Sequence, residues 1–208
     1  MTTELSTREL ARTRTRFFDL LKSFFLAEPD AECLSRWRGI LTSLAGTTVS
    51  PRLDRAVTEL NRLLATKKLQ DIRDEYYDLF VDPYSEHRVP TTASWYLDGR
   101  NFGPTLVQLR AFLMETGIIR EETVEESDDA IAVLLDTMVT LIEEERDPAV
   151  GYEAQQRLLA SYLHPACSRF AETLAGSPRA DFYGACAGFL AGYLEIELGL
   201  LAATERPA

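Results

Sequence analysis

Apolar residues recur every three or four positions along most of the chain, which is the period of an α-helix. No run of alternating apolar residues is long enough to predict a strand. We therefore expect an all-α, single-domain helical bundle of about nine helices over residues 1–208. The apolar side chains that mark the first four helices are Phe17, Phe18, Leu21, Phe24 and Phe25, then Leu34, Trp37, Ile40, Leu41 and Leu44, then Leu53, Val57, Leu60 and Leu64, then Leu69, Ile72, Tyr76, Leu79 and Phe80.

Residues that start or end helices separate these runs. Ser6 and Glu9 have the spacing of a capping box, and Ser50 before Pro51 places a proline in a first helical turn. The other predicted helix starts are at Asp30, at Gly103–Pro104, at Ser127 with Asp128 and Asp129 in the first turn, and at Ser177–Pro178. The other predicted helix ends are at Gly46, Gly117, His164–Pro165 and Gly176.

The last apolar run repeats glycine at positions 184, 188 and 192, which lie on one stripe of a helix. Glycine inside a helix costs roughly 1 kcal/mol against alanine. Three such residues indicate a packing role. We expect close approach of a neighbouring helix in the same chain, and the alternative is a contact between copies of the chain.

Residues 81–102 interrupt the helical pattern and predict a long central loop. Pro83 and Pro90 lie in it, and Trp95 and Tyr96 follow in a polar setting. A loop this long inside a compact domain is often functional. The two aromatic side chains either plug the loop into the bundle or form a binding surface, and the sequence leaves both open.

The charge of the chain narrows its partners. Lysine and arginine number 22 against 33 aspartates and glutamates, for a net charge of −11. A chain this acidic repels phosphate backbones, so we expect no nucleic-acid partner. The acidity favours a basic peptide or a basic patch on another protein, or it serves only solubility.

Membrane insertion and a metal site are also not expected. The N-terminal sequence lacks the apolar core of a signal peptide, and the apolar stretch 182–194 is too short to span a bilayer before Glu195 and Glu197. Three widely spaced cysteines and two histidines form no ligand motif. These observations predict a cytoplasmic protein without a Cys/His metal site.

The common catalytic motifs are absent from the sequence. It contains no glycine-rich phosphate loop, nucleophile elbow, HExxH or paired-cysteine motif. The acidic run 121–129 is typical of a solvated segment before a helix, and neither His87 nor His164 has a partner fixed by the sequence. We therefore expect a binding protein rather than an enzyme.

Five segments resemble motifs of the TorD-like family of redox-enzyme maturation chaperones. EYYDLF at 75–80, followed by Pro83, is similar to the E-Y-x-x-L-F-x-x-P segment of that family. PTTASWYLDGRNFGP at 90–104 is similar to its P-x-x-E-S-x-Y-L-x-G loop, and ESDDAIAVLLDTM at 126–138 to its E-x-P-D-H-I-x-x-E-L-x-x-M helix start. YLHPACSRF and DFYGACAGFL, near the C-terminus, resemble the remaining elements.

The likeness covers roughly residues 69–195, in the family's order, with a few departures. Ala93 stands where the family has glutamate, Asp128 where it has proline, and Ala130 where it has histidine, and the tryptophan after the His164 segment is missing. These departures indicate a divergent branch with a client of its own.

The resemblance implies a cytoplasmic, cofactor-free chaperone. Its partners would be the catalytic subunit of a molybdenum enzyme, in apo form, and the twin-arginine signal peptide of that subunit. The chaperone would hold the enzyme until the molybdopterin cofactor is inserted and so delay export. A dimethyl sulfoxide, trimethylamine N-oxide or nitrate reductase, or another molybdenum or tungsten enzyme, fits this role.

The peptide-binding residues that we expect lie in and around the central loop. Carboxylates would engage the two arginines through charge-assisted hydrogen bonds, and aromatic side chains would cover the apolar part of the peptide. The acidic candidates are Asp82, Asp98, Asp128 and Asp129, and the aromatic candidates are Tyr76, Phe80, Trp95 and Tyr96.

Two other functions stay open on the sequence. The first is an all-α structural or regulatory oligomer built on the glycine stripe, with no affinity for signal peptides. The second is an enzyme with a scattered carboxylate or histidine site. A homodimer, including a domain-swapped one with the central loop as its hinge, is compatible with the chaperone.

Overall fold

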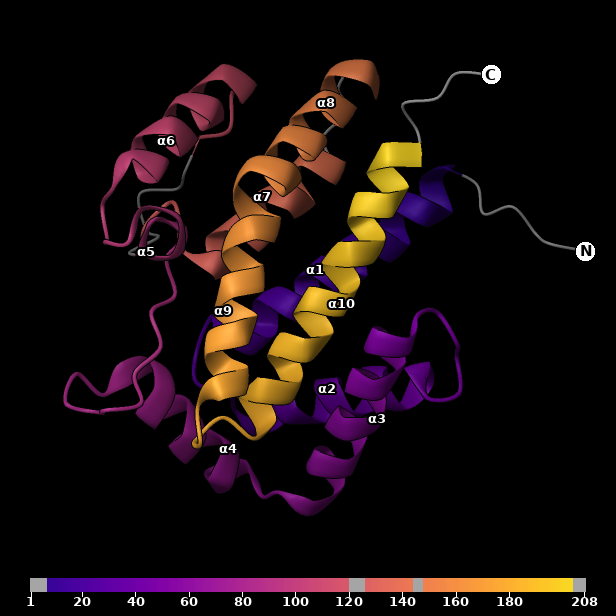
Figure 1. Cartoon of the computed structure of the whole chain (residues 1–208). Helices are drawn as coiled ribbons and strands as arrows, with labels where there is room; N and C mark the ends of the chain where they lie inside the picture. The colour runs from indigo at the N-terminus through magenta and orange to yellow at the C-terminus, as the bar shows by residue number, and fades with distance from the viewer. Residues whose placement is uncertain (1–6, 120–125, 144–147, 204–208) are drawn as a thin grey trace, which may run out of the picture.

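The computed structural model describes residues 7–119, 126–143 and 148–203 (Figure 1). In these residues the chain is helical and without strands, apart from one isolated antiparallel bridge between Thr92 and Ala130. The helices are α1 Thr7–Phe25, α2 Ala31–Leu44, α3 Pro51–Thr66, α4 Leu69–Tyr76, α5 Ala93–Asp98, α6 Pro104–Thr116, α7 Ile131–Glu143, α8 Pro148–Leu158, α9 His164–Gly176 and α10 Phe182–Ala203, with π-helical turns η1 Tyr77–Val81 and η2 Leu159–Leu163.

The all-α prediction is confirmed. Because η1 continues α4 and η2 joins α8 to α9, these described residues form nine continuous helical stretches. Asp30 and Ser50 cap α2 and α3 through their side chains, and α6 ends before Gly117 in the left-handed conformation, as the sequence predicts. Ser6 of the predicted capping box lies outside the described residues.

α10 is the central helix of the bundle. It packs against α3, α9 and α1, and twelve of its 22 residues are buried (Figure 1). The helix continues past the stretch 182–194 to Ala203, and at this full length its composition alone would allow it to cross a membrane. The buried core helix of a soluble protein can have the same length and composition, and α10 has twelve of its 22 residues buried against its neighbours.

Two glycines of the α10 stripe, Gly188 and Gly192, face α3 of the same chain. A Cβ atom on Gly192 would lie 3.1 Å from the backbone nitrogen of Leu53, and one on Gly188 would lie 3.9 Å from the Cβ of Ala56. Any side chain at position 192 would press on the α3 backbone. The expected close approach within the chain is therefore confirmed at Gly192.

The prediction that a helix ends at His164–Pro165 is wrong. The chain continues from α8 through η2 into α9, and the His164 amide donates to the carbonyl of Leu159, five residues earlier. A proline has no amide hydrogen and its ring clashes with the carbonyl four residues before it in a regular helix. A wider π-turn before Pro165 accommodates this proline without ending the helix.

Two predicted helix starts lie too early in the sequence. α10 begins at Phe182 rather than at Ser177–Pro178, and α7 begins at Ile131, so Asp128 and Asp129 precede its first turn. The Ser127 hydroxyl lies 2.5 Å from Oδ1 of Asp129 and donates to it instead of capping α7. In both cases a contact with a distant segment sets where the helix begins.

Candidate functional site

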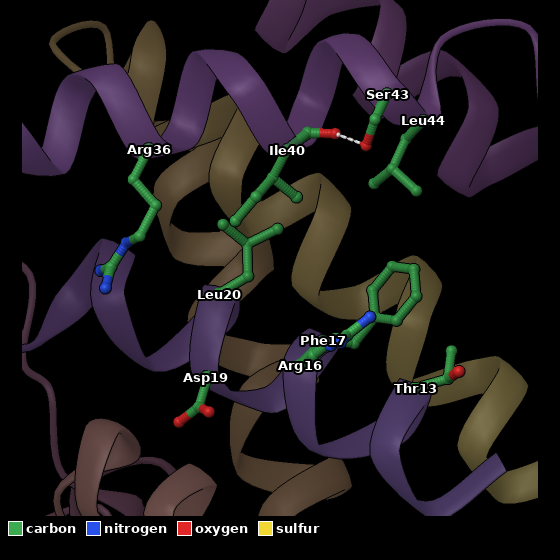
Figure 2. Close-up of a pocket in the computed structure, with 9 residues that line it drawn as sticks. All are labelled: Thr13, Arg16, Phe17, Asp19, Leu20, Arg36, Ile40, Ser43 and Leu44. Atoms are coloured by element: carbon green, nitrogen blue, oxygen red, sulfur yellow. Dashed lines mark hydrogen bonds between the residues drawn. The ribbon is translucent and has the colours of Figure 1, made fainter. Parts of the chain in front are cut away.

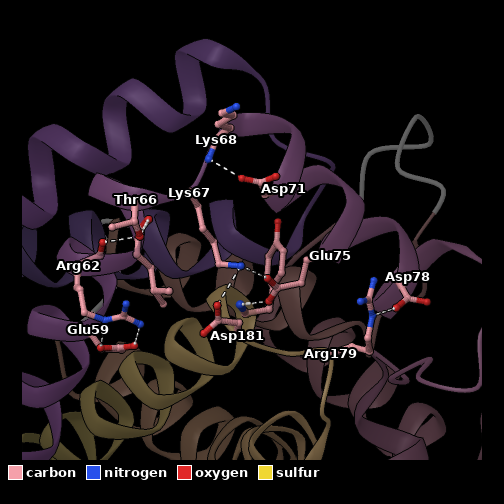
Figure 3. Close-up of polar contacts among 12 residues, drawn as sticks. Glu59, Arg62, Thr66, Lys67, Lys68, Asp71, Glu75, Asp78, Arg179 and Asp181 are labelled. Carbon is pink, nitrogen blue, oxygen red and sulfur yellow. Dashed lines mark hydrogen bonds and ion pairs between the residues drawn. The ribbon is translucent and has the colours of Figure 1, made fainter.

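Glu75, the first residue of the EYYDLF segment, joins the helix before the central loop to the start of α10. This side chain is buried, and its Oε1 accepts a 2.8 Å hydrogen bond from the Tyr183 amide in the first turn of α10 (Figure 3). Its Oε2 lies 3.4 Å from Nζ of Lys67. Burial raises the pKa of Glu75, and the amides of Tyr183 and Phe182 and then Lys67 oppose that rise. Glu75 therefore caps α10.

Tyr76 and Phe80 belong to an aromatic cluster inside the bundle. The Tyr76 ring centroid lies 5.2 Å from that of Phe80 and 5.6 Å from that of Tyr183. Tyr76 is buried, which raises its pKa to about 12, and Phe80 is half-buried against Phe25 and Phe170. Both side chains anchor the loop entry in the core.

The loop itself carries a short helix, α5, which the sequence reading misses. Six residues are too few to show a 3.6-residue period, and the residue that caps the helix is distant in sequence. Oδ2 of the fully buried Asp129 accepts a 2.9 Å hydrogen bond from the Ser94 amide, and its backbone carbonyl accepts one of 2.7 Å from Ala93. Asp129 thereby fixes the start of α5.

Asp98, at the other end of α5, holds α6 in the same manner. Its two oxygens accept 2.8 Å hydrogen bonds from the amide and the hydroxyl of Thr105. A Cβ atom on Gly103 would overlap this carboxylate, so glycine is required there. Glu75, Asp98 and Asp129 thus each accept from the second amide of a helix that begins elsewhere in the chain.

Trp95 and Tyr96 have different environments, since one side chain is exposed and the other is buried. The Tyr96 side chain is buried, its ring lies 6.0 Å from that of Phe170, and its hydroxyl donates to the Pro90 carbonyl at 2.7 Å. Burial raises the pKa of Tyr96. Trp95 is 43% exposed and faces solvent. Tyr96 is the plug, and Trp95 is part of the surface.

The other two acidic candidates differ in burial, because Asp82 is half-buried and Asp128 is buried with an exposed partner. Oδ1 of the half-buried Asp82 accepts from the Tyr84 amide at 2.9 Å, which closes a local turn. Oδ2 of Asp128 accepts from Nε of Arg110 at 2.6 Å, and the Arg110 side chain is 58% exposed. The carboxylate of Asp128 therefore already binds a guanidinium group at the edge of α6.

Exposed apolar side chains are concentrated in one stretch of the sequence. Of the eleven large ones found in the described residues, eight lie between positions 77 and 119. They are Tyr77, Val81, Tyr84, Trp95, Phe102, Val107, Met114 and Ile119. Contiguous exposed apolar surface commonly marks a binding site.

One set of them follows a single face of α6. Val107, Ala111 and Met114 are four and three residues apart and all exposed, while Leu109 and Phe112 are buried on the other side. We call Val107, Ala111 and Met114 the α6 stripe.

Phe102, just before α6, has a φ of 58°, which is rare for a bulky residue, and its side chain is 76% exposed. The sequence analysis did not single out Phe102, the α6 stripe or Arg110. Apolar residues on both faces of α6 were the sequence feature that could have revealed the stripe.

Comparison with known proteins identifies the family. The sequence profile of the nitrate reductase delta subunit family matches residues 48–174, more than half of the chain and all of the candidate residues. The chain belongs to this family. The predicted resemblance to TorD-like chaperones is thereby confirmed.

Curated relatives and a solved structure agree with the family. The chain is 23% identical over 201 residues to the TorD chaperone proteins of two strains of Vibrio cholerae, covering 89% of this chain and 90% of theirs. A crystal structure from Archaeoglobus fulgidus, of a protein assigned to redox enzyme maturation, matches with a TM-score of 0.59 at 17% identity. That match covers 88% of this chain and 93% of the other, and it supports the fold.

Proposed function

We propose that this delta-subunit family member is a cytoplasmic chaperone for the maturation of a molybdenum enzyme. It binds the twin-arginine signal peptide and the apo form of the catalytic subunit, and it delays export until the molybdopterin cofactor is inserted. The family, the TorD relatives and the redox-maturation fold support the chaperone role. The peptide site rests on the geometry around α5 and α6.

The observation that carries the peptide site is the α6 stripe beside the Arg110–Asp128 pair. A twin-arginine signal peptide presents two guanidinium groups and then an apolar segment. Asp128 already accepts from a guanidinium group at 2.6 Å, and Val107 and Met114 are 67% and 82% exposed on the helix that carries Arg110. An acidic acceptor just before α7 and an apolar stripe on α6 thus meet at Arg110, and together they offer both kinds of contact that the peptide requires.

Binding at Asp128 would proceed by exchange of arginines. Asp128 is buried and Arg110 is exposed, so the incoming arginine would replace Arg110 at the same carboxylate while Arg110 turns to water. Burial of an exposed aliphatic side chain contributes roughly 1.5–3 kcal/mol. Most of the affinity would therefore come from the α6 stripe and Trp95, while the carboxylate would select arginine through its directed hydrogen bonds.

The other acidic candidates act by positioning. Asp129 and Asp98 are occupied at the starts of α5 and α6, and Tyr76, Phe80 and Tyr96 lie in the core. These five residues would hold α5 and α6 in place rather than contact the peptide. Asp82, half-buried at the loop entry, is the remaining acidic side chain that a second arginine could reach.

The test begins with the client. Co-purification from native cells identifies the bound enzyme by mass, and a synthetic copy of its signal peptide is then titrated calorimetrically. We expect Met114→Ser with Val107→Ser to weaken binding at least about tenfold, which is about 1.4 kcal/mol. Asp128→Asn should weaken it less and should reduce the preference for an arginine pair over a lysine pair.

A matched control variant tests whether serine in place of any exposed apolar residue weakens peptide binding. Val49 is 54% exposed at the far end of the α2–α3 connection, and Val49→Ser should leave the affinity unchanged. Equal affinities for the wild type and the Val107→Ser, Met114→Ser variant would remove the α6 stripe from the site. A stable oligomer without affinity for any twin-arginine peptide would instead favour the structural alternative.

A further inference from the structure

The arginines of α1 divide between the inside and the outside of the molecule. Arg14 points inward, where its Nε lies 3.0 Å and 3.2 Å from the two carboxylate oxygens of the buried Glu197. Arg8, Arg12 and Arg16 are exposed and four residues apart, so they lie on one stripe of the helix. Within the described part of the chain, none of these three forms an ion pair.

This stripe is unusual in a chain with a net charge of −11. Like charges four residues apart on a helix repel one another, and acidic side chains are abundant elsewhere. Unpaired arginines therefore indicate a surface that is kept positive against the charge of the molecule.

The stripe borders a groove between α1 and α2 with a volume of about 580 Å³ (Figure 2). Figure 2 shows Leu20 and Ile40 pointing toward one another from the two helices, with Phe17 and Leu44 beside them. Arg16 and Arg36 also line the groove and supply positive charge. Its one acidic residue, Asp19, is paired with Lys22 at 3.2 Å. We call this hollow the α1–α2 groove.

Arg16 also lines a second hollow, of about 480 Å³, together with Arg8 and Arg12. Ile142 and Glu143 of α7 border it on the other side. A basic margin therefore extends from the α1–α2 groove along α1, with Glu143 as the acidic residue at its edge.

The α1–α2 groove is held open by rigid contacts. The Phe17 ring stacks on Tyr193 of α10 with centroids 4.8 Å apart and an interplanar angle of 11°. Toward the other end of α1, Nε1 of Trp37 donates to Oγ of Ser23 at 2.8 Å and joins the two helices. A preformed groove loses little freedom when a ligand binds.

We infer that the α1–α2 groove is a docking site for an acidic amphipathic helix of a partner protein. The apolar floor would take the apolar face of the helix, and Arg12, Arg16 and Arg36 would pair with its flanking carboxylates. A concave groove of this kind fits a helix better than it fits a flat lipid surface. A twin-arginine peptide is positively charged and would be repelled here, so this site is distinct from the one at α6.

The experiment uses the full chain and a fluorescent helical peptide of about 15–20 residues, a length at which isolated helices become stable. The peptide carries leucine at positions i, i+3, i+4 and i+7 and glutamate on the flanks. Fluorescence anisotropy should give saturable binding that weakens as salt rises. The double variant R12E/R16E should lower the affinity at least about tenfold.

Control variants and probes keep the proposal falsifiable. Arg55→Glu, at an exposed position of α3, should change the affinity by less than about twofold, and a peptide with lysine in place of glutamate should not bind. The affinity for the signal peptide should be the same in R12E/R16E as in the wild type, which separates this test from that of the α6 site. A circular dichroism spectrum checks that the double variant is folded.

Three results would overturn the proposal. The first is no saturable binding of the acidic peptide, and the second is equal binding by the wild type and R12E/R16E. The third is binding to vesicles of anionic phosphatidylglycerol, lost in R12E/R16E, without binding of the peptide, which would assign the basic margin to a membrane surface instead.

Discussion

α6 and α10 are both apolar around most of their circumference, but they lie in different surroundings. α10 has twelve of 22 residues buried between α1, α3 and α9. α6 has four of 13 residues buried and lies at the edge of the molecule, beside α5 (Figure 1). Burial accounts for the composition of α10, whereas α6 keeps an apolar stripe in water.

An apolar helix therefore has to be interpreted from what surrounds it as well as from its sequence. A single exposed apolar side chain is ordinary, because the surface of any protein is largely apolar. A stripe at helical spacing, next to an acidic residue that binds a guanidinium group, is a stronger indication of binding. The same sequence signal therefore means core in α10 and exposed surface in α6, the surface that we propose for recognition.

The sharpest test of this comparison removes one apolar side chain from each helix. Phe189 of α10 is fully buried, and Phe189→Ala should lower the free energy of unfolding by about 3–5 kcal/mol through lost burial and a cavity. Met114→Ala on α6 should change it by less than about 0.5 kcal/mol, as a surface substitution does. Urea denaturation followed by circular dichroism measures both. A similar loss in the two variants would mean that α6 is part of the core.

Next in size is the effect of a methyl group on the glycine stripe. Gly192→Ala should destabilise the chain by about 1–3 kcal/mol, because its Cβ would press on the backbone of Leu53. Gly188→Ala on the same stripe meets only ordinary contact distances, and it should stabilise the chain by up to about 1 kcal/mol through helix propensity.

Thermal unfolding of the two glycine variants gives the sign of each change. Equal shifts of Tm in the two variants would contradict the close approach of α10 to α3.

The carboxylates of Asp128 and Asp129 should differ in how much they contribute to the free energy of unfolding. Asp129→Ala leaves the buried Ser94 amide without its acceptor and should cost about 1–3 kcal/mol. Asp128→Ala removes a buried carboxylate, but its partner Arg110 is exposed and can turn to water, so the loss should be smaller. Chemical denaturation gives both values, and a greater loss for Asp128→Ala would reverse the assignment of the two residues.

The smallest effect concerns Asp78, which ties the loop entry to the connection before α10. The Ser85 hydroxyl and then the Arg179 guanidinium, both 2.6 Å away, hold the pKa of Asp78 below its usual 3.8. The stability that this pair contributes is therefore complete above the usual pKa and is lost as the pH falls through the folded-state value.

From about pH 5 to about pH 3 the wild type should accordingly lose more stability than Asp78→Asn does. The comparison with the variant cancels the opposite contribution of Glu75, whose pKa is raised. Parallel loss in the two proteins over this range would show that the pair contributes nothing to the folded state.

Much of the candidate site could be located from the sequence, but the roles of its residues could not. The motif segments identified the central loop and the turn before α7, though not the helix α5 within the loop, and the family profile covers them. The acidic residues were expected to bind arginines directly. Asp129 and Asp98 instead cap α5 and α6, because a helix start leaves amides that need an acceptor and these carboxylates lie within reach only in the folded chain.

The sequence by itself determined the helical class, most helix boundaries and the family, because apolar periodicity, capping residues and short motifs are local properties of the chain. The tertiary structure decided which apolar faces are covered and which carboxylates are occupied. Trp95 and Tyr96 are neighbours in sequence, yet one faces water and the other is packed against Phe170. Burial depends on segments that meet only when the chain is folded, and no local pattern encodes that meeting.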